Sequence, residues 1–405
     1  MQKLEAVSVS AQLSEVIRAA LARQGGWLPF DRFMALALYA PGLGYYANAS
    51  RKFGLLPGSG SDFVTAPELS PLFGRALARQ VAQALQACGS AELWEFGAGS
   101  GALAAQLLEA LGDTVQRYTI VELSASLRER QQQRLQAFGA KLHWVDALPE
   151  TMHGVIVGNE VLDAMPVQLL HFDGGQWFER GVALADASVD PATNVGAREA
   201  PQRGAGGAPA RAAGHDAAAL FAWRDRPTPL RPPIDAPIDA HFVPGSVTEI
   251  HPQAEAFMAT LAERLVRGAA FFIDYGFPAA EYYHPQRTGG TLMCHRAHRA
   301  DTDPLLDVGA KDITAHVDFS AIALAAQDGG LDVLGYTSQA HFLINCGLVE
   351  MLEGADIQTT ANAHKLLAEH EMGELFKVIG FAKSCDATFV EAPLGFVHCD
   401  RSHTL

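Results

Sequence analysis

The chain has 405 residues, of which 49% are hydrophobic and 19% charged, a balance typical of a globular protein with a large core. The formal net charge of −15 argues against a broad nucleic-acid-binding surface, since such surfaces neutralise phosphates with Lys and Arg, and it favours a basic partner. No apolar run approaches the roughly 20 residues that span a bilayer. The N-terminus carries Glu5 and Glu15 and no hydrophobic signal core, so we expect a cytoplasmic protein. The five scattered cysteines fit a compartment where thiols stay reduced.

The first part of the chain predicts two short helices and a loop. Apolar residues recur at helical spacing over 9–23 and 30–39, and Gly-Gly and Pro-Gly pairs end these segments. Residues 58–71 are too rich in Gly, Ser and Pro for a regular element. They are expected to pack as an ordered loop before a helix over 72–87.

A glycine-rich turn then follows an apolar strand over 93–96. Its three glycines are Gly97, Gly99 and Gly101, and a helix-forming segment comes next. Because glycine has no Cβ, backbone amides in such a turn can approach a ligand at the start of the helix. The turn predicts nucleotide binding, although Gly97-x-Gly99-x-x-Ala102 also fits the dinucleotide fingerprint.

Three later strands end in polar residues at what would be one edge of a parallel sheet. The strand over 118–121 ends at Glu122, placed to accept hydrogen bonds from a ribose diol. The strand over 142–145 ends at Asp146-Ala147, where the carboxylate or its neighbouring backbone could meet an adenine amine. The strand over 154–158 ends at Asn159-Glu160, facing the ligand crevice.

Alternating strands and helices over 92–178 predict a parallel sheet with helices on both faces. Residues 184–218 are an Ala/Gly/Asp/Pro mixture that is expected to form a surface excursion, with a returning hairpin strand over 221–223 and an extended linker over 227–237. Further strands are predicted over 247–250, 269–273, 290–294, 331–336, 377–382 and 388–390, and helices over 253–266, 341–352 and 361–369.

Taken together, Glu95 before the glycines and the polar strand ends resemble the pattern of S-adenosylmethionine-dependent methyltransferases. A nicotinamide reductase of the short-chain kind needs a Tyr and a Lys four residues apart, and no tyrosine in this sequence has such a Lys. The nicotinamide alternative therefore depends on the ambiguous glycine pattern alone.

Six blocks in order resemble one family, the MidA-type methyltransferases. These are residues 61–70, 95–101, 159–167, 273–276, 290–292 and 312–319. Ser61 departs from the family, which usually has Gly before Asp-Phe, so the backbone of that loop is less well defined by the resemblance. The family has bacterial members and mitochondrial relatives that are arginine methyltransferases acting on a complex I subunit as assembly factors.

The resemblance implies an α/β fold with the mostly parallel, Rossmann-like sheet of a class I methyltransferase, and S-adenosylmethionine as cofactor. An N-terminal helical cap and a cofactor-covering loop would occupy 1–88. The methyltransferase domain would occupy 89–405, with a helical insertion at about 338–372. The flexible excursion at about 184–245, expected from its composition, departs from the family and is peculiar to this sequence. The acceptor would be a basic or arginine-bearing protein, such as a respiratory complex I subunit.

These arguments assign the candidate site residues. Those expected to bind the cofactor are Glu95, Gly97, Gly99, Gly101, Glu122, Leu123, Asp146, Ala147 and Asn159, joined through the resemblance by Asp62 and Thr65. Asn159, Glu160 and Asp163 are the candidate catalytic residues, because Asp163 would project to the same side as Glu160 in a helical turn. Carboxylates so placed would hold a planar guanidinium through charge-assisted hydrogen bonds.

Structural interpretations compete with several of these assignments. Asn159 and Glu160 would serve equally as caps of a following helix, and His316 and Asp318 are expected to be structural, with Asp318 a helix cap. Cys294-His295-x-x-His298 lacks the further ligands of a zinc site, so no metal is expected. At the level of function, the alternative to an enzyme is an assembly chaperone that retains the cofactor fold and works by holding a partner.

Overall fold

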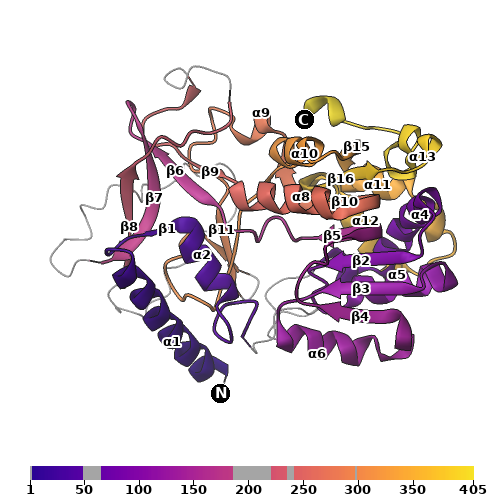
Figure 1. Cartoon of the computed structure of the whole chain (residues 1–405), viewed down its shortest axis with the longest axis horizontal. Helices are drawn as coiled ribbons and strands as arrows, with labels where there is room; N and C mark the ends of the chain where they lie inside the picture. The colour runs from indigo at the N-terminus through magenta and orange to yellow at the C-terminus, as the bar shows by residue number, and fades with distance from the viewer. Residues whose placement is uncertain (1, 49–64, 186–219, 235–240, 297–298) are drawn as a thin grey trace.

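The computed structural model describes residues 2–48, 65–185, 220–234, 241–296 and 299–405. Figure 1 shows two lobes, one built on a sheet covered by helices, and the other on smaller sheets accompanied by α1 and α2. Among the described residues, no helix combines the length and the hydropathy that a membrane span requires.

The larger lobe is built on an eight-stranded sheet whose main path is β15-β16-β10-β5-β2-β3-β4, with β14 paired to β10. From β10 to β4 all neighbours are parallel, whereas β16 is antiparallel to both β10 and β15. The predicted mostly parallel sheet is thus confirmed. Its strands are β2 (Glu92–Phe96), β3 (Arg117–Val121), β4 (Leu142–Val145), β5 (Met152–Asn159), β10 (Leu265–Phe277), β14 (Val317–Asp318), β15 (Asp332–Ser338) and β16 (Phe376–Lys383).

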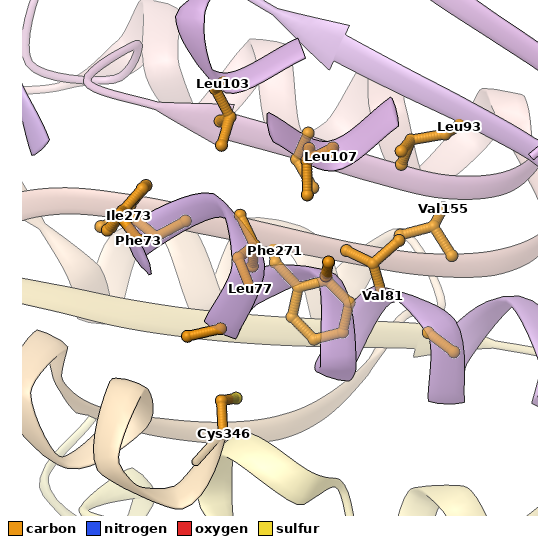
Figure 2. Close-up of a cluster of buried hydrophobic side chains, with 14 of the residues drawn as sticks. Phe73, Leu77, Val81, Leu93, Leu103, Leu107, Val155, Phe271, Ile273 and Cys346 are labelled. Atoms are coloured by element: carbon orange, nitrogen blue, oxygen red, sulfur yellow. The ribbon is translucent and has the colours of Figure 1, made fainter. Parts of the chain in front are cut away.

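Helices cover both faces of this sheet. Successive side chains of a strand point to opposite faces, so apolar strands present a surface to be buried on each face. Phe271 and Ile273 of β10 belong to a core with α4 and α5, whereas Ala270 and Phe272 belong to a core with α8 and α10. Figure 2 shows the first of these cores. The helices of this lobe include α3 (Ala66–Leu69), α4 (Pro71–Cys88), α5 (Ala102–Leu111), α6 (Ala125–Arg134), α8 (Pro252–Arg264), α9 (Ala279–Tyr282) and α10 (Phe319–Asp328).

The helical insertion predicted near 338–372 contains α11 (Gln339–Asn345) and α12 (Ile357–Leu367), which contact α4. Phe342 and Leu343 of α11 and Leu366 of α12 are buried in the same core as α4. The helix predicted over 341–352 is interrupted, because Gly347 takes a left-handed φ of 80° and a short 3-10 turn over Glu350–Leu352 follows.

The smaller lobe contains an antiparallel sheet of β1 (Leu28–Pro29), β7 (Trp177–Leu184), β6 (Gln168–Phe172) and β9 (Val247–Ile250), with β8 (Phe221–Pro227) paired to β7. α1 (Gln2–Arg23) and α2 (Phe30–Tyr39) share a buried core with it. A second sheet is formed by β12 (Arg299–Asp301), β11 (Met293–Arg296) and β13 (Asp312–Thr314). The β8 pairing confirms the returning hairpin strand predicted over 221–223.

Four further sequence predictions about elements are wrong. The loop predicted over 58–71 contains the short helix α3, since Pro67 in its first turn is compatible with a helix start. The alternation of strands and helices stops at Asn159, because Asp173 accepts the N–H groups of Gly175 and Gln176 and so closes a tight β6–β7 hairpin outside the parallel sheet. The strand predicted over 388–390 is instead helix α13 (Ala387–Glu391), which Asp386 caps at the Thr388 N–H. The strand predicted over 290–294 begins only at Met293, because Glu249 accepts the N–H groups of Thr291 and Leu292.

Most of the predicted excursion, residues 186–219 and 235–240, lies outside the described residues.

Candidate active site

A cavity of about 1330 Å³ lies at the carboxyl ends of β2, β3, β4 and β5. Its opposite wall comes from the smaller lobe, with Tyr39 and Tyr46 near α2 and Asp312 and Thr314 of β13. Small-ligand pockets usually measure about 300–1000 Å³. The cavity is therefore large enough for a nucleotide-sized cofactor together with part of a second molecule.

The glycine turn forms one end of the cavity. Gly97, Gly99 and Gly101 have φ angles of 63°, 52° and 80°, all in the left-handed region that favours glycine. A Cβ built on Gly97 would lie 2.9 Å from Cγ2 of Val161, so a side chain there would be too close to the loop after β5. Gly101 is the N-cap of α5, and the first N–H groups of this helix, which have no partner within the helix itself, belong to residues such as Ala102 that line the cavity.

Glu95, at the end of β2, is almost fully buried beside the glycine turn. Its carboxylate accepts a hydrogen bond from the Tyr118 hydroxyl at 2.7 Å. Burial raises the pKa of Glu95 to about 8, the Tyr118 hydrogen bond opposes this shift, and the nearby charge of Glu122 adds to it. Glu95 lines the cavity, so a cationic group bound there would favour its ionised form.

Glu122 follows β3 and lines the same cavity. Its carboxylate accepts the Ser124 N–H at 2.8 Å and a Gln131 side-chain N–H at 2.9 Å. Burial raises the pKa of Glu122, while these two hydrogen bonds and the charge of Arg128 oppose the shift. A carboxylate has about four lone-pair sites, so acceptor capacity remains for a diol.

The other predicted cofactor residues lie around this end of the cavity. Leu123, Asp146 and Ala147 line it and are exposed, and Thr65, the N-cap of α3, lines it from the covering segment. Asp62 lies outside the described residues, so its predicted contact is not placed.

Asn159 ends β5, Glu160 follows it directly, and both line the cavity. The Asn159 side-chain N–H donates to Glu160 at 2.9 Å, whereas Oδ1 of Asn159 is buried with no hydrogen-bond partner among the described atoms. Glu160 has a φ of 54°, which is uncommon for a residue other than glycine. Burial raises the pKa of Glu160 to about 8, and the charges of Asp163 and Asp312 add to the shift.

Asp163 approaches Glu160 closely enough that its charge acts on the Glu160 carboxyl group. Its Oδ2 accepts a hydrogen bond from the Tyr275 hydroxyl, whereas Oδ1 is buried without a partner among the residues described. Burial raises the pKa of Asp163 to about 6, and the Tyr275 hydrogen bond opposes this shift. The structure therefore brings the two predicted acids together in one cavity.

The smaller lobe contributes residues that the sequence did not single out as a site. The rings of Tyr39 and Tyr46 stack with centroids 5.6 Å apart, and the Tyr46 hydroxyl donates to Asp312 at 2.9 Å. His316 also lines the cavity, although its role was expected to be structural. Burial lowers the pKa of His316 to about 4, with the charges of Arg287 and Lys377 adding to the shift, so the ring is neutral at pH 7.

Asp318, by contrast, acts as the expected helix cap, accepting the N–H groups of Ser320 and Ala321 at the start of α10. His298 of the Cys-His-x-x-His segment lies outside the described residues.

Gln131 of α6 is another residue that sequence reasoning missed. It is fully buried, and its side-chain N–H groups donate to the Gly99 carbonyl at 3.0 Å and to the Glu122 carboxylate. Its oxygen accepts the Trp144 ring N–H at 3.0 Å. Gln131 therefore links the glycine turn to β3 and β4. In the sequence, the one feature that could have pointed to this role is a polar residue on the buried face of a predicted helix.

The residues present fit S-adenosylmethionine. The left-handed glycines admit a ligand close to the backbone, and the Glu122 carboxylate retains acceptor capacity for a ribose. Within the part of the chain that the structure describes, Asn159 Oδ1 is a buried acceptor without a donor. The strand order, with one antiparallel strand between β10 and β15, and this cavity define a class I S-adenosylmethionine-dependent methyltransferase.

Comparisons with known proteins agree with this class. A model of the family described as "Putative S-adenosyl-L-methionine-dependent methyltransferase" matches residues 76–337. A crystal structure from Burkholderia thailandensis, of a "likely methyl transferase" bound to S-adenosyl-homocysteine, has 46% sequence identity and a TM-score of 0.85, covering 99% of this chain and 98% of that one.

Curated relatives are more distant. The mitochondrial protein arginine methyltransferase NDUFAF7 homolog of Drosophila melanogaster is 27% identical over 371 residues, covering 84% of this chain and 76% of that protein. The human protein arginine methyltransferase NDUFAF7 is 26% identical over 357 residues, covering 80% and 70%. The chain belongs to this S-adenosylmethionine-dependent methyltransferase family, the MidA type whose motifs it carries.

Proposed function

We propose that this methyltransferase transfers the methyl group of S-adenosylmethionine to an arginine side chain of a partner protein. The observation that carries the proposal is the set of carboxylates around one part of the cavity, Glu160 and Asp163 after β5 and Asp312 from the smaller lobe. A guanidinium is planar and cationic, and it pairs with carboxylates through parallel charge-assisted hydrogen bonds.

Oδ1 of Asp163, which has no hydrogen-bond partner within the described ranges of the chain, supports a cationic acceptor. A buried carboxylate oxygen without a donor is costly, and an N–H group of a bound guanidinium would satisfy it. The cation would also offset the mutual repulsion that helps to raise the pKa of Glu160. The acidic wall is therefore better suited to a positively charged acceptor than to an anionic or apolar one.

Each part of the site has a separate task in this proposal. Gly97, Gly99 and Gly101 would admit the methionine end of the cofactor, Glu122 would bind its ribose, and Asn159 Oδ1 would accept from its amino group. Leu123, Asp146 and Ala147 would border its adenine, and Glu95 would order the glycine turn. Bound S-adenosylmethionine supplies a methyl group that is already activated on a sulfonium sulfur.

The chemistry left to the protein is alignment and the exclusion of water. Glu160 and Asp163 would orient the acceptor nitrogen and accept the proton that this nitrogen gives up. The stacked rings of Tyr39 and Tyr46 would exclude water from the opposite side.

The relatives support the substrate class, because those of Drosophila and human origin are named protein arginine methyltransferases. By the same resemblance we propose that the partner is a basic or arginine-bearing subunit of a respiratory complex. The cytoplasmic location expected from the sequence stays a prediction.

The test is methyl transfer to a protein extract. Purified protein is incubated with methyl-labelled S-adenosylmethionine and an extract of cells that lack the gene, and the labelled proteins are hydrolysed to amino acids. Label in methylated arginine is expected. Label in another amino acid, or no label above that of a heat-inactivated sample, would contradict the proposal.

A Glu160→Gln variant refines the assignment. Turnover is expected to fall by roughly 10- to 100-fold while the dissociation constant of S-adenosylmethionine stays within a few-fold, since Glu160 is proposed to act on the acceptor. A collapse of cofactor binding would place Glu160 in the cofactor site instead.

A further inference from the structure

A buried carboxylate outside the cavity lining holds the turn that carries Glu160 and Asp163. Asp274, near the end of β10, is 1% exposed. Its Oδ2 accepts the backbone N–H groups of Val161, Leu162 and Asp163 at 3.1, 2.9 and 3.2 Å. Its Oδ1 accepts the Tyr275 N–H at 2.9 Å. Four backbone donors converge on one side chain.

This turn needs an external partner to keep its shape. Glu160 has a left-handed φ of 54°, and such a conformation in a residue other than glycine persists only where the surroundings fix it. The Glu160 N–H donates to the Ile273 carbonyl at 2.9 Å, so β10 fixes the start of the turn. Asp274 then fixes the three following residues.

The neighbouring residue, Tyr275, acts on the side chain that the turn presents. Its hydroxyl donates to Asp163, and its ring packs edge-on against His316 with centroids 5.2 Å apart. Asp274 and Tyr275 point to opposite sides of β10, as successive residues of a strand do. One strand end thus fixes both the backbone of the turn and the orientation of its acid.

We propose that Asp274 is a positioning residue for methyl transfer, which holds the 160–163 turn so that the Glu160 and Asp163 carboxylates meet the acceptor nitrogen. The inference rests on the proposed function in so far as these two acids contact the acceptor. Asp274 does not itself line the cavity among the described residues, so it acts through the turn.

The test is Asp274→Asn, assayed by label transfer to the same extract and by calorimetry with S-adenosylmethionine. The oxygen of an Asn side chain can still accept hydrogen bonds from the N–H groups of the turn. Its NH2 group would then face the Tyr275 N–H, and because both are donors that hydrogen bond would be lost. We expect apparent kcat to fall roughly 10- to 100-fold, because small displacements of positioned groups are that costly. The KM and dissociation constant for S-adenosylmethionine should stay within about threefold.

Asp318→Asn is the matched control. Asp318 is also 1% exposed and also accepts backbone N–H groups, but it caps α10 and does not line the cavity among the described residues. It should leave apparent kcat within about twofold of wild type. An equal loss of turnover in both variants would overturn the proposal, as would an Asp274→Asn protein with wild-type turnover or with lost cofactor binding.

Asp274→Ser, which keeps a smaller acceptor, is a second variant in case the first does not fold. If neither variant gives a cooperative thermal transition, Asp274 belongs to the fold and the proposal is wrong. Wild-type label on an amino acid other than arginine would refute the proposed acceptor, but the ratio of variant to wild-type turnover would still test the role of Asp274.

Discussion

Two independent features of the structure disfavour a glutamate at position 160. Its backbone is left-handed, and burial together with neighbouring acids raises its pKa to about 8. Strained backbone conformations and carboxyl groups with shifted pKa values are both concentrated at functional sites. Selection for stability alone would remove them. The combination supports a functional role for Glu160 more strongly than its position after β5 alone.

The shifted pKa of Glu160 predicts a pH-dependent gain in stability on substitution. Because its pKa is raised from 4.5 to about 8, the folded protein binds this proton more tightly than the unfolded chain does. The resulting stabilisation is complete below pH 4.5 and is lost as the pH rises through 8. The free energy of unfolding of Glu160→Gln, measured with denaturant, should therefore exceed that of wild type by roughly 1–3 kcal/mol at about pH 9 and be similar to it at about pH 5.

A control separates this effect from a general loss of negative charge. Glu109→Gln, on the exposed face of α5, should leave the free energy of unfolding unchanged at both pH values. A Glu160→Gln protein that is less stable than wild type at about pH 9 would contradict the assigned pKa.

At the residue scale, sequence reasoning found the acids that follow strands but not what fixes them. Glu122, Asn159 and Glu160 could be predicted because a strand end is a local feature. The hydrogen bond from Tyr275 to Asp163 joins residues 112 positions apart, and no local pattern encodes it. Asp274 could be recognised only as part of a motif at the end of a strand.

At the scale of elements, the glycine turn makes the sharpest prediction. Gly97 and Gly89 have the same φ of 63°, but a Cβ on Gly97 would lie 2.9 Å from Val161, whereas a Cβ on Gly89 has no atom within 4 Å. Alanine at either position should cost about 1–2 kcal/mol of stability through backbone strain. Only Gly97→Ala should also weaken S-adenosylmethionine binding, by at least roughly tenfold, because the turn must move away from the loop after β5.

Calorimetry with the cofactor and thermal unfolding of both variants measure the two effects separately. Equal dissociation constants for Gly97→Ala and Gly89→Ala would show that the close approach to Val161 has no bearing on binding.

Elements with strong local patterns could be predicted, and those shaped by tertiary contacts could not. The strands β2, β3 and β4 begin and end close to where their apolar runs do. The strand predicted from Gly290 starts late because Glu249 of β9 accepts the N–H groups of Thr291 and Leu292, which takes them out of a strand ladder. Residues 388–390 have strand propensity, yet the cap at Asp386 makes them helical.

At the scale of the whole molecule, the cavity belongs to both lobes. The Tyr39 hydroxyl at the end of α2 donates to the Ala164 carbonyl at 2.8 Å, so the helical N-terminal region contacts the loop that follows β5. The central sheet lines one part of the cavity, and the smaller lobe contributes to the lining of the rest. Under the proposed function, this division would let one protein combine the methyltransferase sheet with a separate binding site for the acceptor.

The alternative function is that of a chaperone, which would hold a partner and use the cofactor fold only as a scaffold. A chaperone would need no methyl donor, whereas the proposed catalysis would need the glycine turn to hold one. Cells that lack the gene are therefore complemented with Gly97→Ala and, as the matched control, with Gly89→Ala. If the protein acts as an enzyme, Gly89→Ala restores methylarginine to the partner and Gly97→Ala does not. Full rescue of the deletion phenotype by Gly97→Ala, in a protein that no longer binds S-adenosylmethionine, would favour the scaffold, because the fold would then suffice without its chemistry.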